Sequence, residues 1–281
     1  MQLFVDNLTN VDFSYLDDQR GLVGETWLAS VLLDGGLDKT SMIWDFGQVK
    51  KILRNWLDDQ LDHRLLVPIN SQRLSYEIHN ERITLSWSFS KDSILTMDAP
   101  LEAVALIDAK KINEQTVSQW SLKQLASHFP DNLEHIQLNF EAEDISSAYY
   151  HYSHGLKKHD GNCQRIAHGH RSQIQIWCDG ERDHDLESNW AERWADIYIG
   201  SEEDLVKVDE DNQQMYFAYD APQGHFELTL PARVCYLMNS DTTVECIAAH
   251  IARKLHDENP KNSITVKAFE GLHKGAIFDI Q

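Results

Sequence analysis

An internal repeat is the feature that most restricts how this chain can fold. Residues 24–35, GETWLASVLLDG, align without gaps with residues 169–180, GHRSQIQIWCDG. Both segments begin at a glycine and run through strand-forming residues to an Asp-Gly pair, which favours a tight turn. In each half a helix-like run, further strands, a second helix and a last strand follow. The sequence therefore predicts two copies of one α+β unit, 1–143 and 144–281, joined near Ala142–Ile145 and packed directly on each other.

Apolar periodicity places the helices and strands within each copy. Asp45 is a candidate N-cap for a helix whose apolar side chains recur every three or four residues. Pro130 ends a second helix of the first copy. The remaining elements predicted from periodicity are a helix over about Glu114–Phe129, strands over Ile83–Trp87 and Ile136–Phe140, a last helix over Thr243–His256 and a final strand over about Ser263–Phe269.

Five histidines and a cysteine lie in the short window Tyr150–Arg171. His168 and His170 are separated by one glycine and lead into Ser172–Cys178, whose alternating apolar residues predict a half-buried strand. Side chains two positions apart on a strand share a face, so both imidazoles should point the same way. The pattern favours a metal site with a thiol, Cys163, beside it.

A third imidazole would complete the ligand set. His154 is the candidate, because it follows the strand-like run Ile145–Ser153, which can pair alongside the strand that carries the other two ligands. His151 and His159 remain alternatives. Three neutral imidazoles hold Zn²⁺ at roughly 2.0–2.1 Å and leave a fourth position open, which is the catalytic arrangement.

Motifs spread along the chain resemble one enzyme family. The order His154-Gly-Leu, Cys163 and His168-Gly-His170 resembles the zinc and nucleophile signature of the 6-pyruvoyltetrahydropterin synthase and 6-carboxytetrahydropterin synthase family. Further similarities are Thr243-Val-Glu245, which is like the family's Thr-x-Glu at a helix start, Phe269-Glu270, which is like its pterin-anchoring glutamate, and Leu61-Asp62-His63, which is like its Asp-His pair.

The resemblance implies a fold and an assembly. It predicts two tandem tunnelling-fold (T-fold) units of α+β class, each an antiparallel sheet with helices on one face. In this family the active site forms between neighbouring units, and barrels are built by oligomerisation. Edge strands of such small units need partners, so we expect a homo-oligomer.

The two copies lack different parts of the family's site. When they are aligned through Gly24 and Gly169, His168 and His170 fall on Val23 and Glu25, so the first copy has no three-histidine set. The second copy has no equivalent of the Asp-His pair. The resemblance therefore predicts one composite site, with the zinc half in 144–281 and the proton-transfer half in 1–143.

The resemblance assigns catalytic roles to Cys163, His63 and Asp62. A free thiol has a pKa of about 8.5, which a nearby metal or basic group can lower, so Cys163 is the candidate base. His63, oriented by Asp62, would be the second proton carrier. Without the resemblance, the preferred explanation of Asp62-His63 is a solvated helix end, where the helix dipole favours histidine.

Four further residues are candidates for substrate binding. Glu270, with Glu245 in support, would accept the N–H edge of a pterin ring. Lys157 and Arg165 belong to a local basic cluster that could hold a triphosphate. The alternatives are a strand-end carboxylate for Glu270, a helix-turn glutamate for Glu245 and, for the cluster, solvated charges that balance Asp160.

The implied reaction is that of a zinc-dependent lyase acting on 7,8-dihydroneopterin triphosphate. A 6-carboxytetrahydropterin synthase, which feeds 7-deazapurine (queuosine) synthesis, is the first expectation. The loop from Cys163 to His168 is intermediate between those typical of the two enzyme types, so 6-pyruvoyltetrahydropterin synthase is an alternative. The others are an activity of the dihydroneopterin aldolase type and a non-catalytic pterin-binding or interaction protein.

The net charge limits the classes of partner. The chain of 281 residues has 25 Lys plus Arg against 45 Asp plus Glu, a formal charge of −20, which argues against nucleic acid or an anionic membrane as the main partner. No secretory leader pattern or membrane-spanning apolar run is evident, so a cytoplasmic location is expected. The four cysteines lack paired spacing, which disfavours disulfides.

Overall fold

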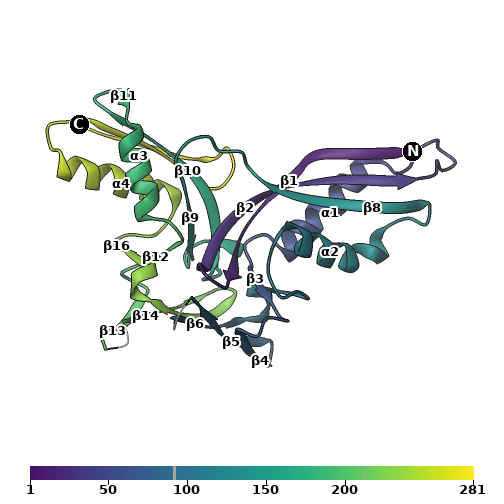
Figure 1. Ribbon diagram of the computed structural model, residues 1–281, viewed down its shortest axis with the longest axis horizontal. Helices are drawn as coiled ribbons and strands as arrows, with labels where there is room; N and C mark the ends of the chain where they lie inside the picture. Colours follow the sequence, from purple (N-terminus) through teal and green to yellow (C-terminus); the bar gives the residue numbers. More distant parts are fainter. Residues whose placement is uncertain (91–92, 212) are drawn as a thin grey trace.

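The computed structural model of the protein describes residues 1–90, 93–211 and 213–281. Within these ranges the strands form three sheets. Figure 1 shows the first half of the chain on the right and the second half on the left. A third sheet lies below them and takes strands from both halves.

The first sheet has the strand order β7-β3-β1-β2-β8. Its central strands carry alternate apolar side chains such as Phe13 and Val31 on one face, where both helices of this half pack. Helix α1 begins after Asp45, whose carboxylate accepts from the Gln48 N–H at 3.0 Å, as the sequence predicted. The elements are β1 (Gln2–Asp17), β2 (Gly21–Gly35), α1 (Phe46–Gln60), β3 (Leu65–Pro68), β7 (Val104–Ile107), α2 (Glu114–Leu125), the 3₁₀ turn η2 (Ala126–His128) and β8 (Leu133–Ala142).

The second sheet repeats this plan with the order β16-β12-β9-β10-β17-β18, and β11 pairs with β10. Helix α4 begins after its N-cap Thr243 and buries Ile247, Ile251 and Leu255. The elements are β9 (Tyr149–His154), the 3₁₀ turn η3 (Asn162–Gln164), β10 (His168–Cys178), β11 (Glu181–Arg182), α3 (His184–Arg193), β12 (Ile197–Ser201), β16 (Cys235–Met238), α4 (Val244–Glu258), β17 (Ile264–Phe269) and β18 (Gly275–Ile280).

The third sheet joins the halves through β6 and β15, where Met97 pairs with Leu228. Its order is β13-β14-β15-β6-β5-β4, and its buried face forms a core with residues from both halves. The elements are β4 (Leu74–His79), β5 (Arg82–Phe89), β6 (Ser93–Pro100), η1 (Leu101–Ala103), β13 (Leu205–Asp209), β14 (Gln214–Ala221), β15 (Gly224–Pro231) and η4 (Ala232–Val234).

The two halves also meet where β1 and β2 cross β9 and β10. Gly24 pairs with Ser14 in one sheet, and Gly169 pairs with Ser153 in the other. The Ser14 and Ser153 hydroxyls are 2.7 Å apart, and a Cβ on Gly24 would lie 1.8 Å from the Tyr152 carbonyl oxygen. The two repeated glycines are therefore required by a backbone crossing, and equivalent residues of the two halves face each other there.

The α+β class and the T-fold units are confirmed, with differences of detail. Parallel pairs (β1 with β3, β9 with β12) accompany the antiparallel ones, because each pair is joined by a long crossover that includes a neighbouring strand and a helix. The expected strand Ile145–Ser153 begins only at Tyr149, and the expected final strand is followed by β18. The Asp179-Gly180 turn is present between β10 and β11, but β2 extends through Gly35.

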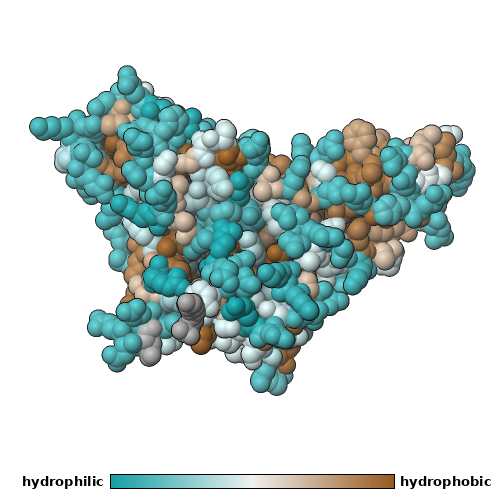
Figure 2. Space-filling model, viewed as in Figure 1, coloured by the Kyte–Doolittle hydropathy of each residue, from teal (hydrophilic) through white to brown (hydrophobic). Residues whose placement is uncertain are grey.

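The surface in Figure 2 is mainly hydrophilic, in keeping with the net charge of −20. Apolar side chains gather on the arm at the right of this view, which carries the outer parts of β1 and β8. Among the described residues, no helix is both long and apolar enough to cross a membrane.

Candidate functional site

Strands β9 and β10 bring three histidines together. His154 ends β9, His168 begins β10, and the two are paired across the sheet. His170 follows two residues later on the same face. The ring centroids of His154 and His168 are 4.5 Å apart, and that of His170 lies 5.4 Å from that of His154. The three side chains are at most 1% exposed, and each offers a ligand atom within 4.8 Å of the others.

Hydrogen bonds occupy one ring nitrogen of His154 and of His168 and leave the other free for a ligand, whereas neither ring nitrogen of His170 has a hydrogen-bond partner among the described residues. The Nδ1–H of His154 donates to the Thr242 carbonyl at 2.9 Å, and that of His168 donates to the Arg165 carbonyl at 2.8 Å. Their buried Nε2 atoms have no hydrogen-bond partner in the described parts of the chain. Burial, followed by the neighbouring histidines, holds the pKa of both well below its usual range. Neutral imidazoles with unpaired, converging Nε2 atoms fit a metal ion.

The two alternative ligands have other surroundings. His151 points to the opposite face of β9, where its Nδ1–H donates to the Gly24 carbonyl at 2.7 Å. His159 is exposed, and its Nδ1 accepts from the Gly161 N–H at 2.9 Å. This geometry favours His154 as the third ligand.

Asp62 and His63 reach this cluster from the first half of the same chain. They follow α1, and His63 has a φ of +55°, which turns the chain back toward β1. The His63 N–H donates to the Asp12 carbonyl at 2.6 Å, and the Asp62 carboxylate accepts from the Asp12 N–H at 2.8 Å. The His63 ring centroid lies 5.0 Å from that of His168. The zinc half and the Asp-His half expected from the sequence therefore adjoin within one chain.

Cys163 completes a second group of ligand-type side chains with His63 and His168. The Nδ1 of His63 is bonded to the Asp62 carboxylate, and Cys163 lies within hydrogen-bonding reach of the His63 ring. Burial would lower the pKa of His63, but Asp62 and Cys163 raise it to about 10. An imidazolium beside a thiol is an arrangement that can give and take protons.

Glu270 lies at the other side of the cluster. Its carboxylate is 4.0 Å from His170 Nε2 and 3.9 Å from Lys274 Nζ. Lys274 also donates to the buried Asp12 at 3.1 Å. Burial would raise the pKa of Asp12, but His170, Lys274 and the Thr26 hydroxyl hold it well below its usual range. Asp12 is thus fully engaged, whereas the Glu270 side chain is 23% exposed beside His170 and remains accessible to a ligand.

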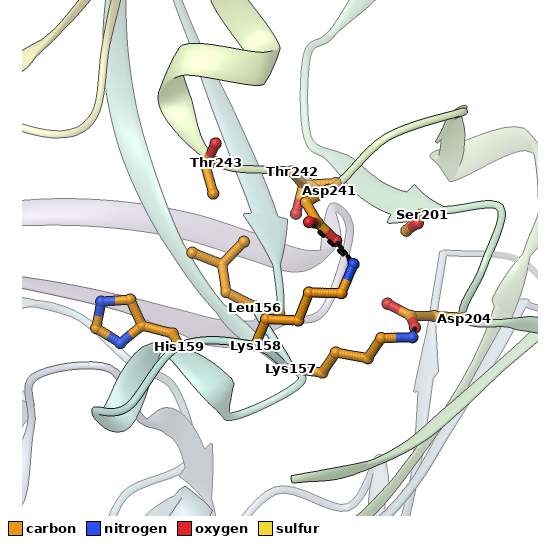
Figure 3. A pocket seen from close by; sticks show the side chains of 10 residues that line it. Leu156, Lys157, Lys158, His159, Ser201, Asp204, Asp241, Thr242 and Thr243 are labelled. Atoms are coloured by element: carbon orange, nitrogen blue, oxygen red, sulfur yellow. Dashed lines mark hydrogen bonds and ion pairs between the residues drawn. The ribbon is translucent and has the colours of Figure 1, made fainter.

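The other three candidate substrate residues differ in surroundings. Glu245 is exposed in the first turn of α4. Figure 3 shows Lys157 directed at Asp204, to which it donates at 2.6 Å, so its charge is largely balanced. Arg165 is 4% exposed, and its Nη1 has no partner among the described residues, although its Nε donates to Gln223 at 3.2 Å. Of the two cations, Arg165 is the one with unused hydrogen-bonding capacity.

Figure 3 also shows the small cavity lined by residues 155–159 and by the segment 241–243 just before α4. Its volume is about 130 Å³, and Lys158 spans it to reach Asp241 at 3.0 Å. Thr242, which accepts from His154, forms part of its wall. The cavity thus adjoins the histidine cluster through Thr242.

Asp12, Thr242 and Lys274 are site residues that the sequence analysis missed. Asp12 occupies the first-half position equivalent to His151, because Asp12 is paired with Thr26 as His151 is paired with Arg171. That alignment was the one signal that could have drawn attention to it. Lys274 lies in the loop before β18, a strand that was also missed.

The positions in the first half that correspond to the three histidines carry Tyr15, Val23 and Glu25. The counterpart of His63 is Asp196, since both have a φ of +55° and precede equivalent parallel strands. Here the Arg20 guanidinium bridges the halves, donating to Asp196 through Nε at 2.8 Å and to the Tyr15 hydroxyl through Nη1 at 3.2 Å. In the first half, the Arg20 guanidinium therefore lies at the position that corresponds to the histidine cluster of the second half.

The fold and the histidine cluster define a protein of two T-fold units with a candidate metal-dependent centre. The sequence profile of the 6-pyruvoyl tetrahydropterin synthase family matches residues 14–125 and 143–279, and the chain belongs to this family.

Solved structures of this family resemble the chain at low sequence identity. The 6-pyruvoyl tetrahydropterin synthase of Plasmodium vivax is 18% identical with a TM-score of 0.43, over 54% of this chain and 96% of that chain. That of Plasmodium falciparum is 16% identical with a TM-score of 0.42, over 51% of this chain and 92% of that chain. None of the curated proteins compared with the chain matches it.

Proposed function

We propose that the protein is a zinc-dependent carbon–oxygen lyase acting on 7,8-dihydroneopterin triphosphate. The observation that carries this proposal is the meeting of the buried three-histidine cluster with Cys163, His63 and Asp62. A pterin-synthase-like lyase is the activity typical of the family to which the chain belongs.

His154, His168 and His170 would hold the zinc ion, each through Nε2. A zinc ion with an open position would act as a Lewis acid on the hydroxyl oxygens of the substrate side chain and make the adjacent C–H more acidic. Zinc is favoured over harder cations because the donor set is three imidazoles and no carboxylate. The buried ligands also exclude competing water from the inner side of the cluster.

Cys163 and His63 would then act as the general base and the general acid of the reaction. The Cys163 thiolate accepts the proton from a side-chain carbon, and the electron pair left behind expels the triphosphate as the C–O bond breaks. His63, whose raised pKa favours the imidazolium, returns a proton to the product. Asp62 fixes the ring orientation through the hydrogen bond to Nδ1, which leaves Nε2 to face the substrate.

The substrate contacts follow from charge and position. Glu270, near His170 Nε2, would accept from the N–H edge of the pterin. Arg165, whose Nη1 is unpaired among the described residues, would meet the triphosphate. Lys157 would contribute less, because Asp204 and Glu203 lie within 3.0 Å of its amine. Glu245 remains a candidate for support of the pterin anchor.

For the product we retain the 6-carboxytetrahydropterin type, which feeds 7-deazapurine (queuosine) synthesis. The family description favours 6-pyruvoyl tetrahydropterin as the second candidate. The chain would work as a homo-oligomer in the cytoplasm. Support for oligomers comes from the exposed edge strand β8 and from apolar side chains on the arm that carries it, such as Phe4, which is 61% exposed.

Incubation of the zinc-loaded protein with 7,8-dihydroneopterin triphosphate, followed by product identification, tests the proposal. Release of triphosphate is expected, with kcat reduced roughly 10²–10⁴-fold in both Cys163→Ala and His63→Ala. Cys178→Ala is the matched control, because that thiol contacts Asn262 far from the cluster. Unchanged activity in both site variants would overturn the assigned roles, and a zinc-loaded protein that forms no product would overturn the proposed reaction.

A further inference from the structure

The three histidines of the cluster differ in the acceptor that faces Nδ1. For His154 and His168 the acceptor is a backbone carbonyl of the second half, which any residue at that position would supply. His170 Nδ1 makes no hydrogen bond within the described residues, and the Asp12 carboxylate lies beside it, with Oδ1 at the ion-pair distance of 3.3 Å. One ligand thus depends on a side chain, and this side chain belongs to the first half of the chain.

Asp12 is held in place from several directions. It is 1% exposed and accepts from the Thr26 hydroxyl at 2.6 Å through the same oxygen that faces His170. Its Oδ2 accepts from Lys274 Nζ at 3.1 Å. Its backbone N–H donates to Asp62, and its carbonyl accepts from the His63 N–H. A carboxylate anchored in this way cannot rotate away from the imidazole without leaving buried polar groups unpaired.

We propose that Asp12 is the positioning residue of the metal centre, holding His170 with Nδ1–H toward the first half and Nε2 toward the ion. The inference rests on the proposed zinc site and deepens it. Carboxylates that accept from the second nitrogen of a ligating histidine fix its tautomer and raise its basicity. The arrangement makes metal binding by the second half depend on β1 of the first.

Asp12 itself is a less suitable ligand than the three histidines. Its Oδ1 faces the Nδ1 side of His170, whereas Glu270 lies near Nε2 at 4.0 Å. Both carboxylate oxygens are already engaged by Thr26 and Lys274. Direct coordination would require these bonds to break, so its contribution is made through the imidazole.

The test measures metal binding in the full chain. Zinc affinity is determined by competition with a chromophoric chelator for wild type, Asp12→Ala and Asp12→Asn, and the cobalt(II) absorption spectrum of each is recorded. We expect about 10–100-fold weaker zinc binding in Asp12→Ala and an altered cobalt spectrum. Asp12→Asn should lose less, because the amide oxygen can still accept from Nδ1–H.

Asp196→Asn is the matched control. The half-buried Asp196 carboxylate also links the two halves, through its ion pair with Arg20, but it does not contact His170. The substitution should lower stability while leaving zinc affinity and the cobalt spectrum unchanged. Equal zinc affinity and spectra in wild type and the folded Asp12→Asn and Asp12→Ala proteins would overturn the inference alone. A wild type that binds no zinc would overturn the proposed function as well, and a spectrum change shared by Asp196→Asn would reduce Asp12 to a packing role.

Discussion

The two halves of the chain place different chemistry on the same backbone positions. In the second half, His154, His168 and His170 converge with unpaired Nε2 atoms. In the first half the equivalent positions hold Tyr15, Val23 and Glu25. The difference teaches that the fold supplies the backbone geometry twice, but the described side chains form a candidate metal centre only in the second half.

The Asp62-His63 pair shows the reverse pattern, because it is present in the first half and absent from the equivalent position of the second. His63 faces the histidine cluster, whereas its counterpart Asp196 forms an ion pair with Arg20. Each half therefore keeps one part of the site, and the crossing of β1 and β2 with β9 and β10 brings the two parts together. At the counterpart position the Arg20 guanidinium is bonded to Asp196 and to the Tyr15 hydroxyl.

The largest contrast should come from His168 and its counterpart Val23. His168→Ala removes a side chain shared by both groups of ligand-type residues, so stoichiometric zinc and lyase activity should both be lost. Val23→Ala should cost stability by about 1–2 kcal/mol through a core cavity and leave bound zinc at wild-type level. Metal analysis of the purified proteins checks both, and retained zinc in His168→Ala would refute the ligand assignment.

The next largest effect should be a loss of stability when a glycine at the crossing of the two halves is substituted. Gly24→Ala places a Cβ 1.8 Å from the Tyr152 carbonyl oxygen, so the strands must separate at a cost of about 3 kcal/mol or more. Gly36→Ala is the control, because its Cβ would meet no atom within 4 Å. Denaturant unfolding measures both. Similar midpoints for the two variants would show that the halves do not pack as described.

The smallest effect should come from Glu25, the counterpart of His170. Burial raises the pKa of Glu25 from its ordinary 4.5 to about 7, so the folded protein holds its proton more tightly than the unfolded chain. The stability associated with the protonated form is fully present below pH 4.5 and is lost as the pH rises through 7. Glu25→Gln should therefore match wild type near pH 4.5 and exceed it by on the order of 2 kcal/mol at pH 8.

Urea unfolding across this pH range checks the Glu25 prediction. Glu134→Gln, an exposed glutamate in β8, provides the control and should track wild type at every pH. A stability gain in Glu25→Gln that does not change with pH would mean that burial of the charge is not its cause.

Local sequence patterns were sufficient for part of this picture. The alternation over Ser172–Cys178 predicted β10 and the shared face of His168 and His170, the N-cap candidate Asp45 located α1, and apolar periodicity over Thr243–His256 predicted α4. The repeat of Gly24 and Gly169 predicted two similar units. Each of these signals lies within a few residues of the feature it predicts.

The remaining features depend on contacts between distant segments. β1 was not predicted because its apolar pattern is interrupted by a bulge between Val5 and Thr9, and with it Asp12 was missed. The pairing of β6 with β15 joins residues more than a hundred positions apart. Lys157 is balanced by Asp204, which no local pattern could indicate.

The contact between the Ser14 and Ser153 hydroxyls has a consequence for how such a protein can change. In a symmetric pair of identical chains, a residue on the twofold axis meets its own copy, so every substitution is made twice. Here the two sides of the axis are encoded separately. Equivalent residues such as Asp12 and His151, or Glu25 and His170, can therefore be substituted one at a time. A composite site can then change in one half while the equivalent residue of the other half stays the same.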